Sequence, residues 1–327
     1  MQPALTVLVR GLLALAALLI ASAAATAQTY PARPITVVVP FPPGASNDAL
    51  ARITRDSLSE ILGQPIVIEN RPGAAGSTGA GSVANAAPDG YTLLISVNAP
   101  ITMNGFLQKN FPFDPKTAFA PVAHAADTML MLAVHESVPA KTVTELVDYA
   151  KMNPGKLSFG SAGVGSGHHI TGELLKQKTG IDITHIPYRG SGPAIQDLVA
   201  GHIPISFGTP PAILPQAAAG KIRILAVSED RRFPDLPDVP TIAETVPGVS
   251  IPISWLGLLA PAGTPKPIVD KLSAAMAATV KKPDVIAKLK QQGMLAVGEG
   301  PEALDRKIRS ELALWARVMP SIGIQPE

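Results

Sequence analysis

A short buried strand, a glycine-rich loop and the start of a helix occur together twice in this sequence, at residues 39–47 and 159–169. In open α/β sheets, ligands lie at the carboxyl ends of the strands. Helix N-termini at that edge present unpaired N–H groups and a partial positive charge, and glycine lets the backbone approach a ligand closely. Each loop alone also fits an ordinary strand-to-helix turn. Their paired occurrence predicts a site for a small anion, such as a carboxylate, between two helix ends.

Sequence motifs of catalytic and nucleotide sites are not matched. Neither Ser161 nor Ser166 has the flanking glycines of the G-x-S-x-G nucleophile elbow. No glycine-lysine pair is followed by Ser or Thr, as a phosphate-binding loop requires. After Gly163-Val164-Gly165, His168 stands where a dinucleotide fingerprint has its third glycine. We therefore predict a protein that is not an enzyme and uses no cofactor.

Histidines are the only residues that suggest a metal site. His168 and His169 are adjacent, and His185 and His202 follow along the chain. Neighbouring residues on a helix point about 100° apart, so adjacent histidines do not converge on one ion. No H-E-x-x-H or paired-carboxylate spacing accompanies them. We predict no metal, and interpret His169 as a brace for its own loop.

Two other polar residues could take part in chemistry. Asp48 stands at a helix start, where a side-chain cap is commoner than a general base. Arg189 fits a contact with a ligand carboxylate as well as it fits a solvated turn. A secreted hydrolase or isomerase of a small carboxylate, using Asp48, His169 or Arg189, is therefore the alternative to a binding protein.

The composition excludes several classes of protein. Among the 327 residues there is no cysteine, which excludes disulfides, a thiolate nucleophile and a cysteine-linked lipid anchor. The 27 Lys and Arg nearly balance the 25 Asp and Glu, so no basic field is available for nucleic acid. An aromatic content of 4% argues against a stacking platform for bases or sugars.

The N-terminus predicts export. An apolar run at residues 11–20 follows Arg10 and leads to Ala25-Thr26-Ala27, which fits the A-x-A cleavage rule. The run is shorter than the roughly 20 residues of a membrane-spanning helix. We predict a signal peptide over residues 1–27 that is cleaved after Ala27.

Strands and helices are expected to alternate along the rest of the chain. Strands are predicted at residues 35–39, 65–69, 91–96, 129–134, 157–159, 184–188, 203–207, 222–227 and 254–260. Helices are predicted near residues 47–62, 168–178, 267–281, 284–292 and 302–318, and another opens with a capping box at Thr142 and Glu145. Gly63 and Gly180 fit helix C-caps. Alternation of this kind predicts parallel sheets and an α/β class.

Short motifs follow one another along the whole chain after the signal peptide. They are Tyr30-Pro31-Ala32-Arg33-Pro34-Ile35, Pro40-Phe41-Pro42-Pro43-Gly44, Asp48-Ala49-Leu50-Ala51-Arg52, Gly63-Gln64-Pro65, Glu69-Asn70-Arg71-Pro72-Gly73, Pro88-Asp89-Gly90-Tyr91-Thr92, Phe119-Ala120-Pro121-Val122, Ser161-Ala162-Gly163, Gly165-Ser166, His169, Gly172-Glu173, His185-Ile186-Pro187-Tyr188-Arg189-Gly190, Pro237-Asp238-Val239-Pro240-Thr241 and Ala260-Pro261-Ala262-Gly263-Thr264-Pro265. Together and in this order, they resemble the Bug family, the periplasmic solute-binding receptors of tripartite tricarboxylate transporters.

The resemblance implies a type 2 periplasmic-binding-protein fold, in which two Rossmann-like lobes are joined by two hinge crossings. Crossings near Asp127 and Pro252 give a discontinuous first lobe, residues 28–127 and 252–327, and a second lobe, residues 128–251. The implied protein is a monomer in the periplasm. It captures a dicarboxylate, amino acid or aromatic acid in the cleft and delivers it to the permease. A sensory receptor for a membrane kinase is the further alternative.

By its motifs, the resemblance also places the ligand contacts. They are Phe41, Pro42, Pro43, Gly44, Ala45, Ser46 and Asn47 in one lobe and Ser161, Ala162, Gly163, Val164, Gly165, Ser166, Gly167, His169, Tyr188, Arg189, Gly190 and Ser191 in the other, with Ser96, Val97, Asn98, Gly208, Thr209 and Pro210 closing the walls. Backbone N–H groups and ordered waters would hold the ligand. Two positions depart from the family pattern, because Ala45 replaces a usual second glycine and only backbone is offered near Gly208.

Overall fold

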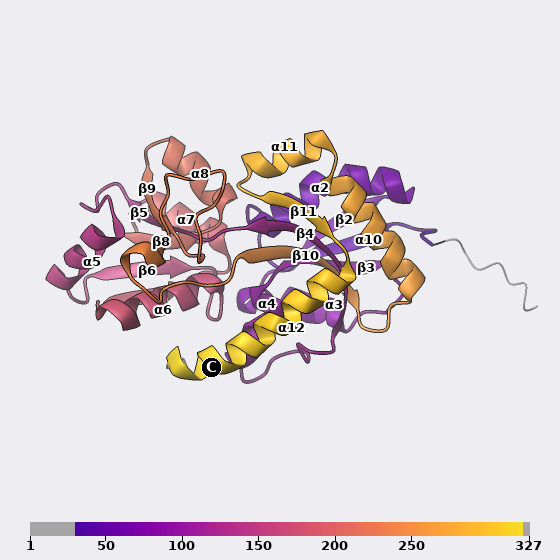
Figure 1. Ribbon diagram of the computed structural model, residues 1–327, viewed down its shortest axis with the longest axis horizontal. Helices are drawn as coiled ribbons and strands as arrows, with labels where there is room; N and C mark the ends of the chain where they lie inside the picture. Colours follow the sequence, from indigo (N-terminus) through magenta and orange to yellow (C-terminus); the bar gives the residue numbers. More distant parts are fainter. Residues whose placement is uncertain (1–29, 323–327) are drawn as a thin grey trace, which may run out of the picture.

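The computed structural model describes residues 30–322, so the predicted signal peptide lies outside the described residues. The described chain forms a mixed α/β structure with two sheets, one in each half of the elongated molecule (Figure 1). No helix in this part of the chain combines the length and apolar character needed to cross a membrane.

The first sheet has six strands, in the order β11-β4-β10-β3-β1-β2. They are β1 (Ile35–Val39), β2 (Ile66–Asn70), β3 (Thr92–Val97), β4 (Phe119–Thr128), β10 (Ser254–Pro261) and β11 (Leu295–Glu299). One face packs on α2 (Ser46–Leu62), α10 (Lys266–Val280) and α11 (Pro283–Gln291), and the other on α3 (Ser77–Ala84), α4 (Ala99–Thr102) and α12 (Pro301–Val318). Short 3-10 turns occur at Ala74–Gly76 and Asn104–Phe106.

The second sheet has five strands, in the order β7-β6-β8-β5-β9. They are β5 (Met131–His135), β6 (Leu157–Ser161), β7 (Ile183–Pro187), β8 (Ile205–Gly208) and β9 (Ile222–Val227). Its faces are covered by α5 (Val143–Met152) and α6 (Gly167–Thr179) on one side and by α7 (Ser191–Val199) and α8 (Pro210–Ala218) on the other. The short helix α9 (Ile242–Thr245) lies on the return path to the first sheet.

The two sheets share one topology. In the first, β2, β1 and β3 are parallel and β10 runs antiparallel beside β3. In the second, β7, β6 and β8 are parallel and β5 runs antiparallel beside β8. Both antiparallel strands follow a passage from the other sheet. The carboxyl ends of the parallel strands, where the glycine-rich loops begin, are therefore positioned in the same way in both halves.

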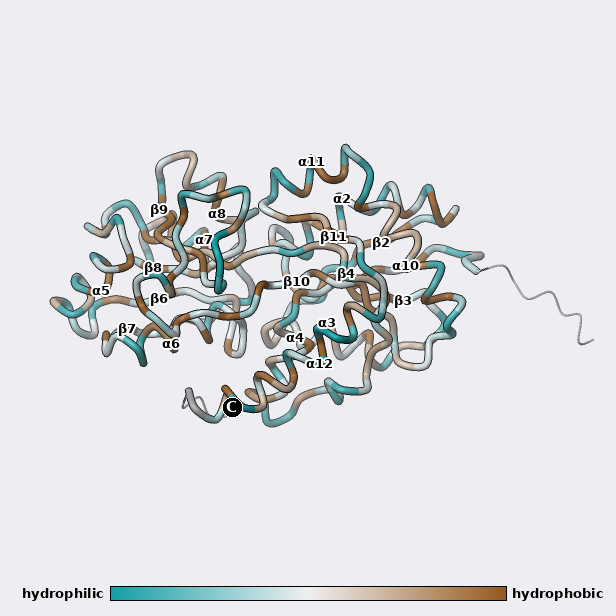
Figure 2. The backbone as a smooth tube through the Cα atoms, viewed as in Figure 1, coloured by the Kyte–Doolittle hydropathy of each residue, from teal (hydrophilic) through white to brown (hydrophobic). Residues whose placement is uncertain are grey.

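Burial explains why these segments become strands. All five residues of Ile35–Val39 are β-branched, and four of the five are buried, as expected for a central parallel strand covered on both faces. Figure 2 shows hydrophobic residues along the strands, whereas the outer helices alternate between hydrophobic and hydrophilic residues. That alternation lets each helix bury one face on its sheet.

The chain passes from the first sheet to the second between Thr128 and Met131, and returns before Ser254. A short segment at Ser228 and Glu229 joins the two passages. The N–H of Ser228 donates to Leu130 O at 2.9 Å, and Ser228 O accepts from the N–H of Ile251 at 3.0 Å. Glu229 Oε1 accepts from the Leu130 N–H at 2.8 Å. The limits of the two lobes stay a prediction, but both passages are tied to this one segment.

The C-terminal helix α12 forms a third connection between the halves (Figure 1). It begins against the first sheet, where Leu304 and Ile308 are buried. At its other end, Trp315 and the following Met319 join the core of the second half, together with Leu130. The lobes are therefore joined by packing as well as by their two backbone passages.

Glu229 makes stability depend on pH. Burial raises the pKa of its carboxyl to about 8, from an ordinary value of 4.5. A raised pKa in the folded state means that the contribution of Glu229 is complete below the unfolded pKa and is lost as pH rises through about 8. Between pH 7 and pH 8, we expect the free energy of unfolding to fall by about 1 kcal/mol. Urea unfolding across this range measures the slope.

Glu229→Gln is the test variant, and Glu136→Gln, which removes an exposed carboxyl, is its matched control. We expect Glu229→Gln to flatten the slope whatever it does to stability at pH 7, and Glu136→Gln to leave it in place. An unchanged slope in Glu229→Gln would contradict the assignment.

Candidate functional site

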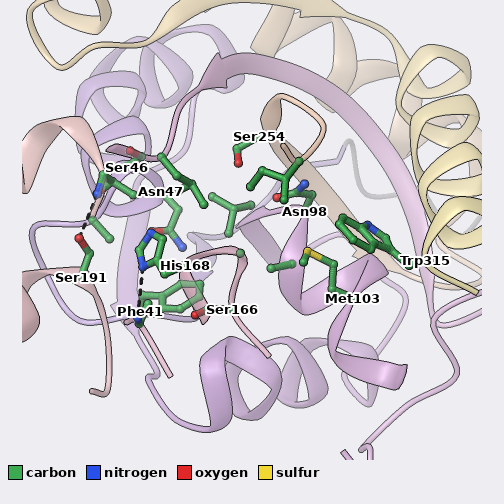
Figure 3. A pocket seen from close by; sticks show the side chains of 18 residues that line it. Phe41, Ser46, Asn47, Asn98, Met103, Ser166, His168, Ser191, Ser254 and Trp315 are labelled. Carbon is green, nitrogen blue, oxygen red and sulfur yellow. Dashed lines mark hydrogen bonds between the residues drawn. The ribbon is translucent and has the colours of Figure 1, made fainter. Parts of the chain in front are cut away.

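A pocket lies between the two halves of the molecule (Figure 3). Its walls come from the loop before α2, the end of β3, α4, the two passages between the sheets, the loop before α6, and α12. The lining residues are Phe41, Ala45, Ser46, Asn47, Val97, Asn98, Ala99, Met103, Leu130, Ala162, Ser166, Gly167, His168, Ser191, Thr209, Ile251, Ser254 and Trp315. The empty space between them, its mouth included, measures about 560 Å³. None of these described lining residues is charged.

Helix α2 begins in this pocket without a side-chain cap. The expectation that Asp48 caps this helix is wrong, because the N-cap is Ala45, which has no side-chain oxygen to accept first-turn N–H groups. Its φ of −88° and ψ of 164° are ordinary for a capping residue, so the usual second glycine is not needed. Asn47 Oδ1 accepts from the Asp48 N–H at 3.2 Å, so the first turn of α2 presents the N–H groups of Ser46 and Asn47 and its partial positive charge to the pocket.

Asp48 points backwards from α2. Its Oδ2 accepts from the N–H of Gly44 at 3.1 Å and pairs with Arg52 at 3.0 Å. Its Oδ1 accepts from Asn70 Nδ2 at 3.0 Å. Although burial opposes the change, these hydrogen bonds lower the pKa of the Asp48 carboxyl. Asp48 is thus a fixed carboxylate that braces the loop before α2 instead of capping the helix, and it does not line the pocket.

Helix α6 differs from α2 at its N-cap, because a serine side chain caps it and two histidine rings brace the loop before it. Ser166 is the N-cap, and its Oγ accepts from the His169 N–H at 3.3 Å. His168 Nδ1 accepts from the Ala162 N–H at 3.1 Å, and His169 Nδ1 accepts from the Gly165 N–H at 3.2 Å. His169 therefore braces its loop, as its position suggested. The Gly167 and His168 N–H groups of the first turn are not used by these bonds, so the expectation that both helix ends serve an anion stays a prediction.

The histidines of the second half are structural in this arrangement. Burial lowers the pKa of His168 to about 4, so the ring is neutral at neutral pH, and its occupied Nδ1 places the proton on Nε2. Burial and the neighbouring His169 lower the pKa of His185 to about 3. The rings of His169 and His185 stack at 4.2 Å, and His185 Nε2 lies 2.6 Å from Ser161 Oγ. In the described chain, no three metal-ligating side chains gather.

Three buried polar atoms on the pocket wall have no hydrogen-bond partner within the described structure. They are Nδ2 of Asn47, Oγ1 of Thr209 and Nε1 of Trp315, on side chains that are 1%, 5% and 2% exposed. A buried polar group without a partner costs free energy, so each marks a position where a ligand or water would complete the bonding. Thr209 also corrects the expectation that only backbone is offered near Gly208.

Behind the pocket wall, Glu311 of α12 holds Asn98 in place. Its Oε2 accepts from Asn98 Nδ2 at 3.3 Å and from Thr102 Oγ1 at 2.8 Å, and its Oε1 accepts from Trp255 Nε1 at 2.8 Å. Burial raises the pKa of this carboxyl to about 7, against the effect of the three donors. Helix α12 thus supplies one wall residue, Trp315, and also Glu311, which supports a second wall residue, Asn98.

The structure brings some of the expected contact residues together in the pocket. Those that line it are Phe41, Ala45, Ser46, Asn47, Val97, Asn98, Ala162, Ser166, Gly167, Ser191 and Thr209. Others line two separate grooves, with Pro43 and Gly44 in one and Gly163, Val164, Tyr188 and Arg189 in the other. The remaining expected residues line none of these three surfaces: Pro42, Ser96, Ser161, Gly165, His169, Gly190, Gly208 and Pro210.

Seven lining residues were not expected from the sequence. They are Ala99, Met103, Leu130, His168, Ile251, Ser254 and Trp315. Leu130, Ile251 and Ser254 lie on the two passages between the lobes, so the predicted crossings near Asp127 and Pro252 could have indicated them. Trp315 carried no local signal, because only tertiary packing brings the end of α12 to the pocket.

The cap of α6 can be tested by mutation. We expect Ser166→Ala to lower the free energy of unfolding by about 1 kcal/mol, because it removes the side chain that accepts the His169 N–H. Thr142→Ala, which removes the equivalent cap from α5, is the matched control and should cost a similar amount. Urea unfolding of both variants gives the comparison. A Ser166→Ala protein as stable as the wild type would contradict the cap.

Comparison with known proteins agrees with this architecture. The sequence model of the tripartite tricarboxylate transporter family receptor, TctC, matches residues 50–324. BugT of Bordetella pertussis is 35% identical over 303 residues, which are 92% of this chain and 93% of BugT. An R. palustris protein solved with adipate is 38% identical with a TM-score of 0.87, covering 91% of this chain and 100% of that one. MatC from Rhodopseudomonas palustris, solved with bound malate, is 34% identical with a TM-score of 0.82, and the match covers 88% of this chain and 98% of MatC.

The family match spans most of the chain, and the relatives are aligned over nearly their whole length. Relatives of this kind are receptors that bind solutes, which excludes the alternative of a hydrolase or isomerase. Asp48, His169 and Arg189, the residues of that alternative, also do not meet in the pocket. The chain belongs to the TctC, or Bug, family of tripartite tricarboxylate transporter receptors, and it is a solute-binding protein with a two-lobed α/β fold.

Proposed function

We propose that this receptor captures a small carboxylate at the uncapped N-terminus of α2 and delivers it to the permease of a tripartite tricarboxylate transporter. The observation that carries the proposal is Ala45, which leaves the first turn of α2 without a side-chain cap at the pocket wall. The unpartnered Asn47 Nδ2 lies on the same turn, and its amide is a donor suited to an anion.

The electrostatics of the pocket suit one carboxylate. No Lys or Arg is among its described lining residues, so the positive ends of the helices that begin at the pocket, α2 and α6, are the features that attract an anion. A charge buried without such compensation would be costly. Hydrogen bonds between N–H donors and a carboxylate are among the stronger kinds, which offsets part of the desolvation. The bound adipate and malate of the two R. palustris relatives support a small acid as the ligand class.

Closure of the lobes would complete the site. The pocket draws its wall from both halves, so a ligand there contacts both and favours the closed arrangement. The loops already approach closely: a Cβ built on Gly190 would lie 2.7 Å from Pro42, and one built on Gly163 would lie 3.4 Å from Ala75. The segment at Ser228 and Glu229, between the two passages, is the natural pivot for the motion.

The proposed cellular location follows from the family and from the predicted signal peptide over residues 1–27. The chain would be exported, cleaved after Ala27 and released into the periplasm as a monomer that shuttles to its permease. Its lobes would be residues 28–127 with 252–327, and residues 128–251.

Ala45→Asp tests the site with opposite effects on stability and binding. Aspartate at an N-cap accepts first-turn N–H groups, so we expect the free energy of unfolding to rise by about 1 kcal/mol. The same carboxylate would occupy the position of the ligand, so affinity for the best-bound acid should fall at least about tenfold. Thermal shift and calorimetry on the refolded mature chain measure both.

Two variants control this experiment. Ala45→Ser adds a neutral cap and should weaken binding less than Ala45→Asp does. Gly300→Ser adds a cap to α12, whose N-cap has none, and lies away from the pocket, so it should leave affinity unchanged. Equal affinity in Ala45→Asp and the wild type would rule out α2 as the carboxylate site.

A further inference from the structure

We propose that the preferred ligand is a monocarboxylate with an apolar body that ends in an uncharged hydrogen-bond acceptor, such as a carbonyl, and that Trp315 Nε1 binds this acceptor. The inference rests on the proposed function, because it takes the end of α2 as the carboxylate site. It adds a second subsite, at the opposite end of the pocket, and a chemical class for the group bound there.

The two ends of the pocket differ in character. Figure 3 shows Ser46 and Ser191 at one end and Met103 and Trp315 at the other. Met103 and Trp315 are buried in one apolar cluster with Leu130 and Ile251, all four of which line the pocket. A ligand with its carboxylate at α2 would therefore lay its other end against an apolar wall. Burying apolar surface there contributes favourably to binding.

Trp315 also presents one polar atom at the apolar end. Its side chain is 2% exposed, and within the described residues Nε1 has no hydrogen-bond partner. The other tryptophan gives a contrast, because Trp255 Nε1 donates to Glu311 at 2.8 Å. Indole N–H is a donor only, so the group that satisfies it must be an acceptor. A neutral acceptor on the ligand does so without bringing a second charge into an apolar environment.

A second carboxylate would find no compensating charge at this end. The described lining residues include no Lys or Arg. Figure 3 shows His168, in the first turn of α6, on the Asn47 side of the pocket and away from Trp315, so the other helix end does not serve the apolar end. The titratable groups bonded to wall residues from behind are two carboxyls, Glu311 on Asn98 and Glu229 on Leu130, and either would repel an anion when ionised. The geometry thus favours monocarboxylates over compact di- and tricarboxylates.

Two length series of straight-chain acids test the preference. Calorimetry on the refolded mature protein would compare two series matched in length: the monocarboxylates from butyrate through octanoate, and the dicarboxylates from succinate through suberate. At the best-binding length, we expect the monocarboxylate to bind at least about tenfold tighter than its dicarboxylate. A dicarboxylate that binds equally well or better overturns the proposal. So does the absence of binding by every monocarboxylate.

Trp315→Phe tests the acceptor site, since it keeps an aromatic wall and removes the N–H. The probes are levulinate and its longer keto homologues, each compared with the unsubstituted acid of the same length. We expect the wild type to bind the keto acid more tightly and Trp315→Phe to lose about fivefold or more of that affinity, with the unsubstituted acid unaffected. Equal losses for both acids, or no loss for either, would contradict the role of Nε1.

The outcomes separate this inference from the proposed function. If Ala45→Asp abolishes binding of a dicarboxylate such as malate or adipate, the carboxylate site at α2 stands and the apolar subsite is rejected. If monocarboxylates bind but Ala45→Asp does not weaken them, the proposed site at α2 fails instead.

Discussion

The rest of the site depends on one helix end that the chain leaves uncapped inside its core. Most helices satisfy their first N–H groups with a side chain or with water. In α2, Ala45 occupies the capping position and Asp48 is turned back to Gly44 and Arg52, so the first turn faces the interlobe pocket with its N–H groups and its partial charge. The missing cap leaves the free protein less stable at this point, and under the proposed function an anion is the partner that the N–H groups lack. A capping side chain introduced at position 45 would stabilise the free protein and would compete with a ligand for the same N–H groups.

The two halves of the molecule contribute different chemical groups to the pocket around this helix end. The histidines of α6 accept N–H groups of the loop before that helix and hold the loop in place, while the first turn of α6 also lines the pocket. Helix α12 crosses from one half to the other, and it brings Trp315 to the pocket and Glu311 to Asn98. The pocket therefore combines two helix starts, α2 and α6, with an apolar end formed by Met103 and Trp315.

Much of the architecture follows from local sequence signals, and the site only partly does. The strand Ile35–Val39, the C-caps Gly63 and Gly180 and the cap pair Thr142 and Glu145 were predictable, because each depends on neighbours in the chain. Strands β4 and β11 were not predicted: β4 is rich in alanine and contains Pro121, and β11 is a short edge strand, so pairing rather than propensity creates them. Likewise, the engagement of the α6 loop and the arrival of Trp315 depend on contacts between distant segments.

The most direct test of the account is a crystal structure of the mature protein with its tightest-binding straight-chain acid. The account predicts that the carboxylate oxygens lie within about 3.2 Å of the backbone nitrogens of Ser46 and Asn47, with the chain of the ligand directed toward Trp315. A carboxylate bound instead at the start of α6, or in the groove beside Arg189, would contradict it.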